Sequence, residues 1–102
     1  MEFTIYILYS HLMTRFYCGQ TDDFSKRIDR HNSGLVKTTK PGIPWIKVWT
    51  VTVASRSEAL MLERKIKKRG IKRYMIDLGF DFEKIIGERD VASRLSGISA
   101  SR

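Results

Sequence analysis

Two short segments near the N-terminus place the strongest constraint on the fold of this chain. Residues 3–9 (FTIYILY) and 15–21 (RFYCGQT) are rich in β-branched and aromatic side chains, which favour strands. Residues 10–14 (SHLMT) form strands poorly, and we expect them to turn the chain. Two strands joined by so short a connection pair antiparallel. The sequence therefore predicts that the fold begins with a β-hairpin.

A helix is predicted directly after this hairpin. Asp22 and Asp23 offer capping side chains at its start, where acidic groups also interact favourably with the helix dipole. Phe24 and Ile28 recur at helical spacing behind them, and Gly34 suits the left-handed position that ends a helix.

A loop and a third strand are predicted next. Residues 37–44 hold both prolines, which is typical of a loop, whereas residues 45–53 are β-branched and aromatic. Trp45 and Trp49 stand four residues apart on this strand, so a period of two places them on the same face. Core packing is the favoured role for both rings, and base stacking is the alternative.

A second helix follows, because Ser55 and Glu58 have the spacing of a capping box and Gly70 suits its end. Its core-facing residues are expected to be Ala59, Leu62 and Ile66. Residues 74–78 are ambiguous, and residues 80–86 predict a short third helix.

The predicted order is therefore ββαβα with a C-terminal helix. This order indicates an α+β fold in which a small three-stranded antiparallel sheet is flanked by helices. We expect one domain over residues 1–87, followed by a flexible tail that contains Ser and Arg over residues 88–102.

The charge balance points to a polyanionic partner. The 102 residues include 19 Lys and Arg against 11 Asp and Glu, which gives a formal net charge of +8. Cys18 is the only cysteine, so no internal disulfide can form, and with His11 and His31 it is too little for a zinc site built from Cys and His. No apolar run is long enough to cross a membrane, and Met1 to Tyr6 lack the features of a signal peptide. We therefore expect a cytoplasmic protein.

Five matches in a fixed order then carry a family resemblance. Thr4-Ile5-Tyr6 and Tyr17-Cys18-Gly19 stand eleven residues apart from Tyr to Tyr. Arg27 and His31 follow on the predicted first helix, and Glu63 follows on the second. This set resembles the GIY-YIG nuclease superfamily over about residues 3–75, and is similar to the N-terminal catalytic domain of the incision subunit of bacterial nucleotide excision repair.

The resemblance implies an endonuclease that hydrolyses phosphodiester bonds in DNA with one divalent metal ion, Mg²⁺ or Mn²⁺. By position, Tyr6 and Tyr17 match the two motif tyrosines, Arg27 the helical arginine and His31 a histidine that some members use. Glu63 matches the metal-binding glutamate. Three positions depart from the family pattern: Thr4 replaces a Gly, Cys18 replaces an Ile, and Met75 stands near the place of an Asn found in larger members.

The residue types suit this chemistry. The planar fork of Arg27 matches two phosphate oxygens, and Glu63 can hold Mg²⁺ together with water and substrate phosphate. Tyr6, assisted by His31, is the predicted general base and Tyr17 positions phosphate or water, although the two tyrosines could exchange roles. The structural alternatives are that His31 complements the helix dipole and that Glu63 forms a surface ion pair with Lys67.

A dense basic run begins immediately after Glu63, which suits a track along the DNA backbone. The side chains expected to contact DNA are Arg27, Lys37, Lys40, Arg64, Lys65, Lys67, Lys68, Arg69, Lys72 and Arg73.

The sequence thus predicts a metal-dependent DNA endonuclease that is structure-selective or of low sequence specificity, active in DNA repair, recombination or mobile-element processing. Specificity would come from DNA shape, from a homodimer or from a separate partner protein. The alternatives are a nucleic-acid-binding module that kept the fold without catalysis, and an accessory protein whose basic face meets an acidic partner.

Overall fold

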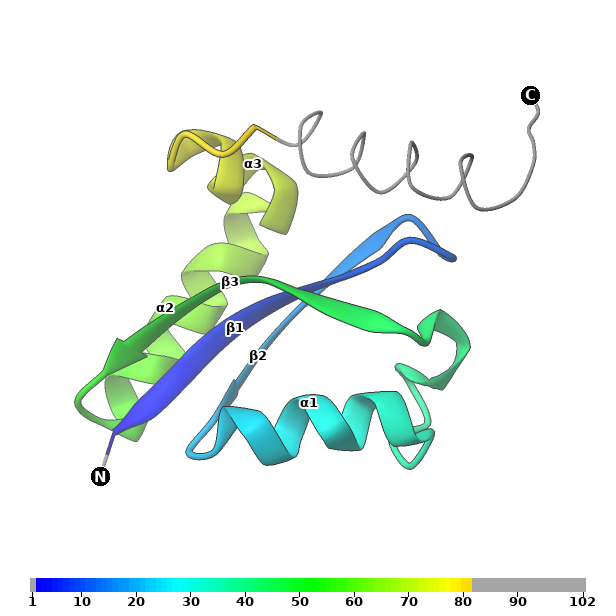
Figure 1. Cartoon of the computed structure of the whole chain (residues 1–102). Helices are drawn as coiled ribbons and strands as arrows, with labels where there is room; N and C mark the ends of the chain where they lie inside the picture. Colours follow the sequence, from blue (N-terminus) through cyan, green and yellow to red (C-terminus); the bar gives the residue numbers. More distant parts are fainter. Residues whose placement is uncertain (1, 82–102) are drawn as a thin grey trace.

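The computed structural model describes residues 2–81 and confirms the predicted α+β class (Figure 1). Its elements in chain order are β1 (Phe3–Ser10), β2 (Arg15–Thr21), α1 (Phe24–Ser33), the 3₁₀ turn η1 (Lys40–Gly42), β3 (Trp45–Val53), α2 (Arg56–Arg69) and α3 (Ile71–Asp77). The ambiguous segment 74–78 is thus largely helical. The predicted helix over 80–86, apart from its first two non-helical residues, and the predicted tail over 88–102 lie outside the described residues.

The sheet is antiparallel throughout and has the order β2-β1-β3. The central strand β1 is almost completely buried because helices cover both of its faces. Ile5 and Ile7 point to one face and Tyr6 and Leu8 to the other, following the alternation of a strand. The continuous hydrophobic run in β1 therefore supplies both halves of the core.

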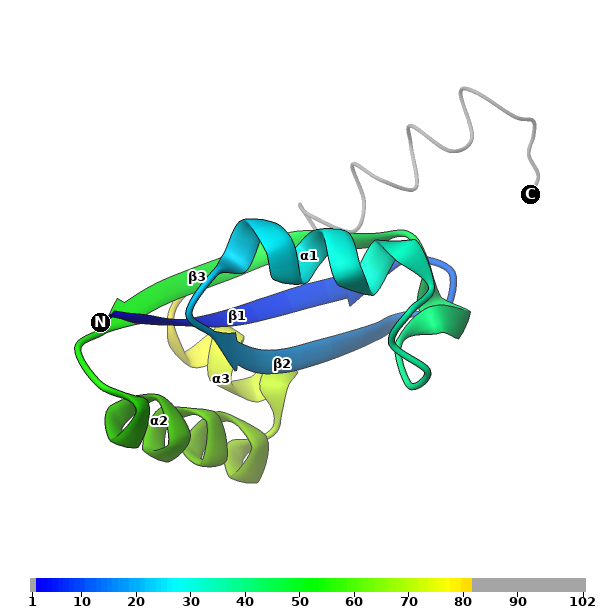
Figure 2. The same ribbon diagram turned by 90° about the horizontal axis from the view of Figure 1, so that it is seen from below.

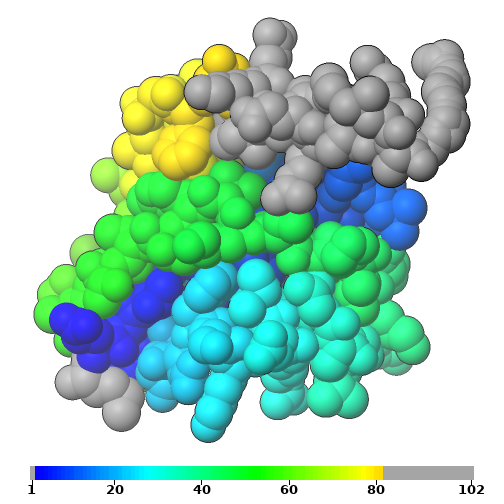
Figure 3. Space-filling view, viewed as in Figure 1, coloured from blue at the N-terminus to red at the C-terminus, as the bar shows by residue number. Residues whose placement is uncertain are grey.

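The helices lie in separate layers on the two sides of the sheet, with α1 on one side and α2 and α3 on the other (Figure 2). Ile5, Cys18 and Ile66 belong to the core on the α2 side. The smaller core on the α1 side is built around Tyr6 and Trp45. In the space-filling view, α1 lies beside β3 on one face of the molecule (Figure 3).

The helix boundaries follow the capping chemistry predicted from the sequence. Asp23 is the N-cap of α1 and accepts a hydrogen bond from the Lys26 amide at 3.1 Å, and Gly34 ends the helix with a φ of 86°. Ser55 caps α2 by accepting from the Glu58 amide at 3.2 Å. These caps fix where α1 begins and ends, and so fix the positions of the side chains on it.

The prediction that Trp45 and Trp49 share a face is wrong. Ile7 pairs with Trp49 and the next residue, Leu8, pairs with Lys47, so β3 contains a bulge. The extra residue reverses the alternation of the strand. Trp45 consequently packs in the core on the α1 side, with its ring centre 6.2 Å from that of Tyr17, whereas Trp49 packs on the other side.

Asn32 fastens the end of α1 to the start of β3. Its side-chain amide donates to the Trp45 carbonyl at 3.0 Å, and its carbonyl accepts from the Trp45 amide at 2.7 Å. The Asn32 side chain thus bonds both the N–H and the C=O of Trp45, as the backbone of a neighbouring strand would. These bonds fix the position of the last turn of α1 relative to the sheet. Within residues 2–81, no helix has both the length and the apolar character needed to cross a membrane.

Candidate active site

Tyr6 lies at the centre of the sheet on the face that α1 covers, and its side chain is fully buried. Its partner across the ladder is Gly19 on the edge strand β2. A Cβ atom at residue 19 would lie 2.5 Å from the Tyr6 hydroxyl oxygen and 2.7 Å from its Cζ. The Tyr6 ring therefore lies directly over the backbone of residue 19, and this close approach requires a glycine.

His31 lies in the last turn of α1 and forms a hydrogen bond with the Tyr6 hydroxyl. The Tyr6 oxygen lies 3.0 Å from His31 Nε2, and Thr39 Oγ1 lies 2.8 Å from His31 Nδ1. His31 and Thr39 are each only 1% exposed. The structure thus brings together two of the residues predicted from sequence and adds Thr39 as a third member of the chain of hydrogen bonds.

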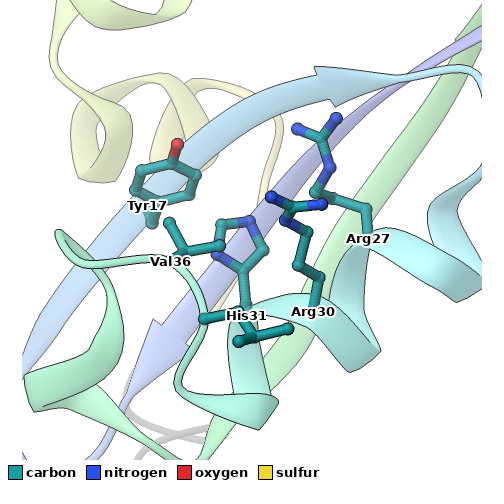
Figure 4. A pocket seen from close by; sticks show the side chains of 6 residues that line it. Tyr17, Arg27, Arg30, His31 and Val36 are labelled. Carbon is teal, nitrogen blue, oxygen red and sulfur yellow. The ribbon is translucent and has the colours of Figure 1, made fainter.

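A cleft of about 500 Å³ opens beside this chain. Its lining residues are Tyr17, Arg27, Arg30, His31, Leu35 and Val36. Arg27 and Arg30 both reach it from α1, and the His31 ring lies between Tyr17 and these two guanidinium groups (Figure 4). The centres of the Tyr17 and His31 rings are 5.0 Å apart. Two permanently charged guanidinium groups beside the Tyr17 hydroxyl and the His31 ring suit an anionic group such as a phosphodiester.

Burial governs the protonation of both partners in the Tyr6–His31 pair. Desolvation and the neighbouring Tyr17 raise the pKa of Tyr6 to about 12, against the opposing effect of the Arg27 guanidinium. Desolvation also lowers the pKa of His31, and the positive charges of Arg27 and Arg30 lower it further. At neutral pH the pair therefore consists of a neutral phenol and a neutral imidazole.

Glu63 approaches the same region from α2, on the other side of the sheet. Its helix packs against β2, and its negative charge contributes to raising the pKa of both Tyr6 and Cys18, which lie on opposite faces of the sheet. Its carboxylate is paired with Lys67, whose Nζ lies 2.6 Å from Glu63 Oε2. Lys67 in turn has a raised pKa, mainly because it donates this hydrogen bond. The predicted surface pair is therefore present at the predicted metal ligand.

The donor set bears directly on the expected metal ion. No group of three or more His, Cys, Asp or Glu side chains lies together in the part of the chain that is described, residues 2–81. A single carboxylate fits Mg²⁺ or Mn²⁺, which can complete their coordination with water and substrate phosphate. It does not fit zinc, which needs three or four protein ligands.

Two other predicted positions are structural. Cys18 is buried beside Tyr17 and desolvation raises the pKa of its thiol to about 12, so it is a packing residue. Met75 is fully buried in the core on the α2 side, away from the cleft residues. Residue 75 therefore contributes to the core and not to the cleft.

The predicted DNA-contacting residues divide into two groups. Arg27 lines the cleft, and the others are exposed: Lys37, Lys40, Arg64, Lys65, Lys67, Lys68, Arg69, Lys72 and Arg73. On α2, a rotation of about 100° per residue puts Lys67 and Arg64 nearest the Glu63 flank and turns Lys65 and Lys68 away from it. Arg69 forms a bidentate pair with Asp77, at 2.8 and 3.2 Å.

Sequence reasoning missed Arg30, Leu35, Val36 and Thr39. Arg30 follows Arg27 by one helical turn, so the spacing could have indicated that the two side chains share a face. The other three residues lie in the loop after α1, and only the fold returns that loop to the His31 ring. No local pattern marks Thr39 as a partner of His31.

The comparison with known families agrees with this geometry. The profile of the GIY-YIG catalytic domain matches residues 2–74, a span that contains both motif tyrosines, α1 and Glu63. The chain therefore belongs to the GIY-YIG family, a family of nucleases.

One solved structure similar in sequence is a UPF0213 protein from Bacillus halodurans, determined by NMR in solution. The two sequences are 31% identical over 76% of this chain and 85% of that chain, and the TM-score is 0.49. No curated protein sequence matches the chain.

Proposed function

We propose that this chain is a DNA endonuclease that depends on a divalent metal ion and cleaves with low sequence specificity. The observation that supports this most is the buried hydrogen bond between Tyr6 and His31, placed beside a cleft that two arginines line. A protein that only binds the DNA backbone needs cations, but it has no need for a phenol held against a neutral imidazole.

The high pKa of Tyr6 leaves almost no phenolate to act as a base at neutral pH, and His31 offers a way around this by accepting the phenolic proton. A group with a pKa near 12 is ionised in only about one molecule in 10⁵ at pH 7, and forming its anion alone costs about 7 kcal/mol. With Nε2 at 3.0 Å, the phenolic proton can pass to the imidazole while the phenol oxygen takes a proton from the attacking water. The charge then rests on imidazolium, not on an isolated phenolate.

The remaining parts of the reaction fall to the groups that line the cleft. The water oxygen forms a bond to phosphorus as the ester bond to the leaving oxygen breaks, and that oxygen takes up a proton from solvent. Arg27 would neutralise the charge that develops on the phosphate oxygens, and the more exposed Arg30 would help to hold the phosphate in the cleft. Tyr17 would position the phosphate or the water from the opposite wall.

Glu63 would hold the metal ion in the complex with DNA. When bound, Mg²⁺ or Mn²⁺ would supply positive charge to the phosphate and its leaving oxygen. In the free protein the Glu63 carboxylate forms an ion pair with Lys67, so this ion pair must break before the carboxylate can hold a metal ion. We therefore expect weak metal binding without DNA and stronger binding with it.

One observation favours the alternative, a nucleic-acid-binding module without catalysis. The 2.6 Å Glu63–Lys67 ion pair satisfies the carboxylate internally, as a surface pair would. This alternative predicts DNA binding that a chelator does not change and no cleavage of any substrate.

A cleavage assay separates the two functions. Purified protein is incubated with branched, flapped, nicked and duplex DNA, with Mg²⁺, Mn²⁺ or a chelator. The endonuclease proposal predicts cleavage of at least one substrate in the presence of metal only, and a loss of 100-fold or more in the Glu63→Gln variant. Failure to cleave any of the four substrates under all conditions, with DNA binding intact, would support the binding module instead.

A matched control excludes a contaminating nuclease. Glu58 lies near the start of the same helix α2 and is exposed, so Glu58→Gln makes the same chemical change away from the cleft. Glu58→Gln should cleave like the wild type when it is prepared by the same procedure.

A further inference from the structure

We infer that Thr39 is a positioning residue, which selects the tautomer of His31 that can take a proton from Tyr6. This inference rests on the proposed endonuclease function and adds a role for the loop after α1. A neutral imidazole carries one N–H and one lone pair, and only the tautomer with its proton on Nδ1 presents a lone pair to the Tyr6 hydroxyl.

The contacts on the Thr39 side favour a proton on Nδ1. The Thr39 hydroxyl donates to the Val36 carbonyl at 3.4 Å, which leaves its oxygen lone pairs facing His31 Nδ1 at 2.8 Å. In this arrangement Nδ1–H donates to Thr39 Oγ1. His31 is 1% exposed, so Thr39 takes the place that a water molecule would occupy at a surface histidine.

The contacts on the Tyr6 side fit the same tautomer. The Tyr6 hydroxyl is fully buried, and its oxygen lies 3.0 Å from His31 Nε2. A neutral phenol carries one O–H donor, which points at Nε2 when that nitrogen carries the lone pair of the imidazole. The two ends of the chain thus agree on one direction of donation, from Tyr6 to His31 and from His31 to Thr39.

Thr39 is itself held rigidly. Its carbonyl accepts from the Trp45 indole N–H at 2.6 Å, and its amide donates to the Val36 carbonyl at 3.1 Å. The side chain is 1% exposed. Because Trp45 is the first residue of β3, the hydroxyl that orients His31 is anchored to the sheet and not only to a loop. Such support is what keeps a catalytic side chain in one geometry.

The test combines NMR with kinetics. Thr39→Val keeps the shape of the side chain and removes its oxygen, and Thr39→Ser keeps the oxygen. Two-bond ¹H–¹⁵N spectra of the imidazole rings report which nitrogen carries the proton, and His11→Gln assigns the signals by removing the other histidine. We expect the Nδ1–H form in the wild type and in Thr39→Ser, and a shift towards the Nε2–H form in Thr39→Val.

Kinetics provides the second readout. Thr39→Val should lower single-turnover cleavage about 10- to 100-fold while leaving DNA affinity unchanged, and Thr39→Ser should restore most of the rate. A wild type that holds the proton on Nε2, or a folded Thr39→Val that keeps the wild-type tautomer, would overturn the inference. The NMR experiment needs no DNA, so it stands even if the wild type cleaves nothing, and that outcome would contradict the proposed function alone.

Discussion

At the scale of single residues, His31 determines how this site responds to pH. It is buried among Tyr6 on β1, Tyr17 on β2 and the guanidinium groups of Arg27 and Arg30 on its own helix. Desolvation and the two cations lower its pKa, so the folded protein keeps the ring neutral where the unfolded chain would begin to protonate it. Stability and proton transfer therefore depend on the same neutral ring.

This predicts that the protein loses stability as the solution becomes more acidic. Below the ordinary histidine pKa of 6.5, the unfolded chain binds a proton at residue 31 and the folded chain does not, so the free energy of unfolding decreases as pH falls. Urea unfolding of the wild type and of His31→Gln between pH 7.5 and pH 5 measures the effect. The wild type should lose more stability than the variant, and parallel curves would contradict a buried neutral His31.

Substitution of the two arginines of the cleft should have different effects: one on the cleavage rate and the other on DNA affinity. Arg27 lines the cleft, and its positive charge acts to lower the pKa of Tyr6. Arg27→Lys, which keeps the charge and loses the fork, should therefore lower the single-turnover rate about 100-fold. Arg30 is more exposed, and Arg30→Gln should mainly weaken DNA binding. Rates and dissociation constants for both variants test this. Equal losses of rate in the two variants would show that the arginines do not have separate roles.

At the scale of elements, much of the fold can be predicted from the sequence because its signals are local. The ranges 15–21 and 45–53 match the observed β2 and β3, and the caps Asp23, Ser55 and Gly34 place the helix ends. The bulge in β3 could not be predicted, because one strand contains no sign of how its neighbour pairs with it. That missing information reversed the expected face of Trp49.

In the candidate site, too, some residues can be predicted from the sequence and others depend on tertiary structure. Tyr6, Tyr17, Arg27 and His31 have a recognisable order, and three of them line the cleft while Tyr6 binds His31 beneath it. Thr39 is joined to the site only through the return of a loop, and the direction of its hydrogen bond depends on the Val36 carbonyl. Hydrogen-bond direction is a tertiary property that residue spacing does not carry.

Gly19 couples β2 to Tyr6 and provides a prediction at this scale. Its backbone does not have a positive φ, so Gly19→Ala is opposed by side chains: a Cβ would lie 2.5 Å from the Tyr6 hydroxyl oxygen and, less severely, 3.2 Å from Cε2 of Tyr17. We expect a loss of about 1–3 kcal/mol in stability and a large fall in cleavage rate. In a Tyr6→Leu background the same substitution should cost much less. An equal cost in both backgrounds, measured by urea unfolding, would contradict this packing.

At the scale of the whole molecule, the net charge of +8 is the physical basis of the proposed affinity towards DNA, but it does not explain the proposed cleavage. The basic residues of α2 are spread over the exposed side of the helix, and the Arg69 guanidinium is already paired with Asp77. The cleft arginines are closer to the residues proposed for catalysis. DNA recognition is thus expected to depend on the backbone charge and shape of the substrate.

The salt dependence of DNA binding tests this view. If about six phosphates are neutralised, log K should fall against log salt with a slope of about −5. Arg64→Gln should reduce the slope by about one, and Arg69→Gln should reduce it less because that side chain is paired with Asp77. Fluorescence anisotropy with a labelled duplex, measured between about 50 and 300 mM salt, gives the slope. A slope near zero would contradict the proposed DNA contacts.

The measurement that tests the central claim most directly is the single-turnover cleavage rate of Tyr6→Phe on a DNA substrate that the wild type cuts. Phenylalanine keeps the buried ring and removes only the hydroxyl that lies 3.0 Å from His31 Nε2. We predict a loss of about 100-fold or more, within the 10²–10⁴ range of general base catalysis, with DNA affinity unchanged. A Tyr6→Phe protein that cleaves at nearly the wild-type rate would contradict the assignment of Tyr6 as the base.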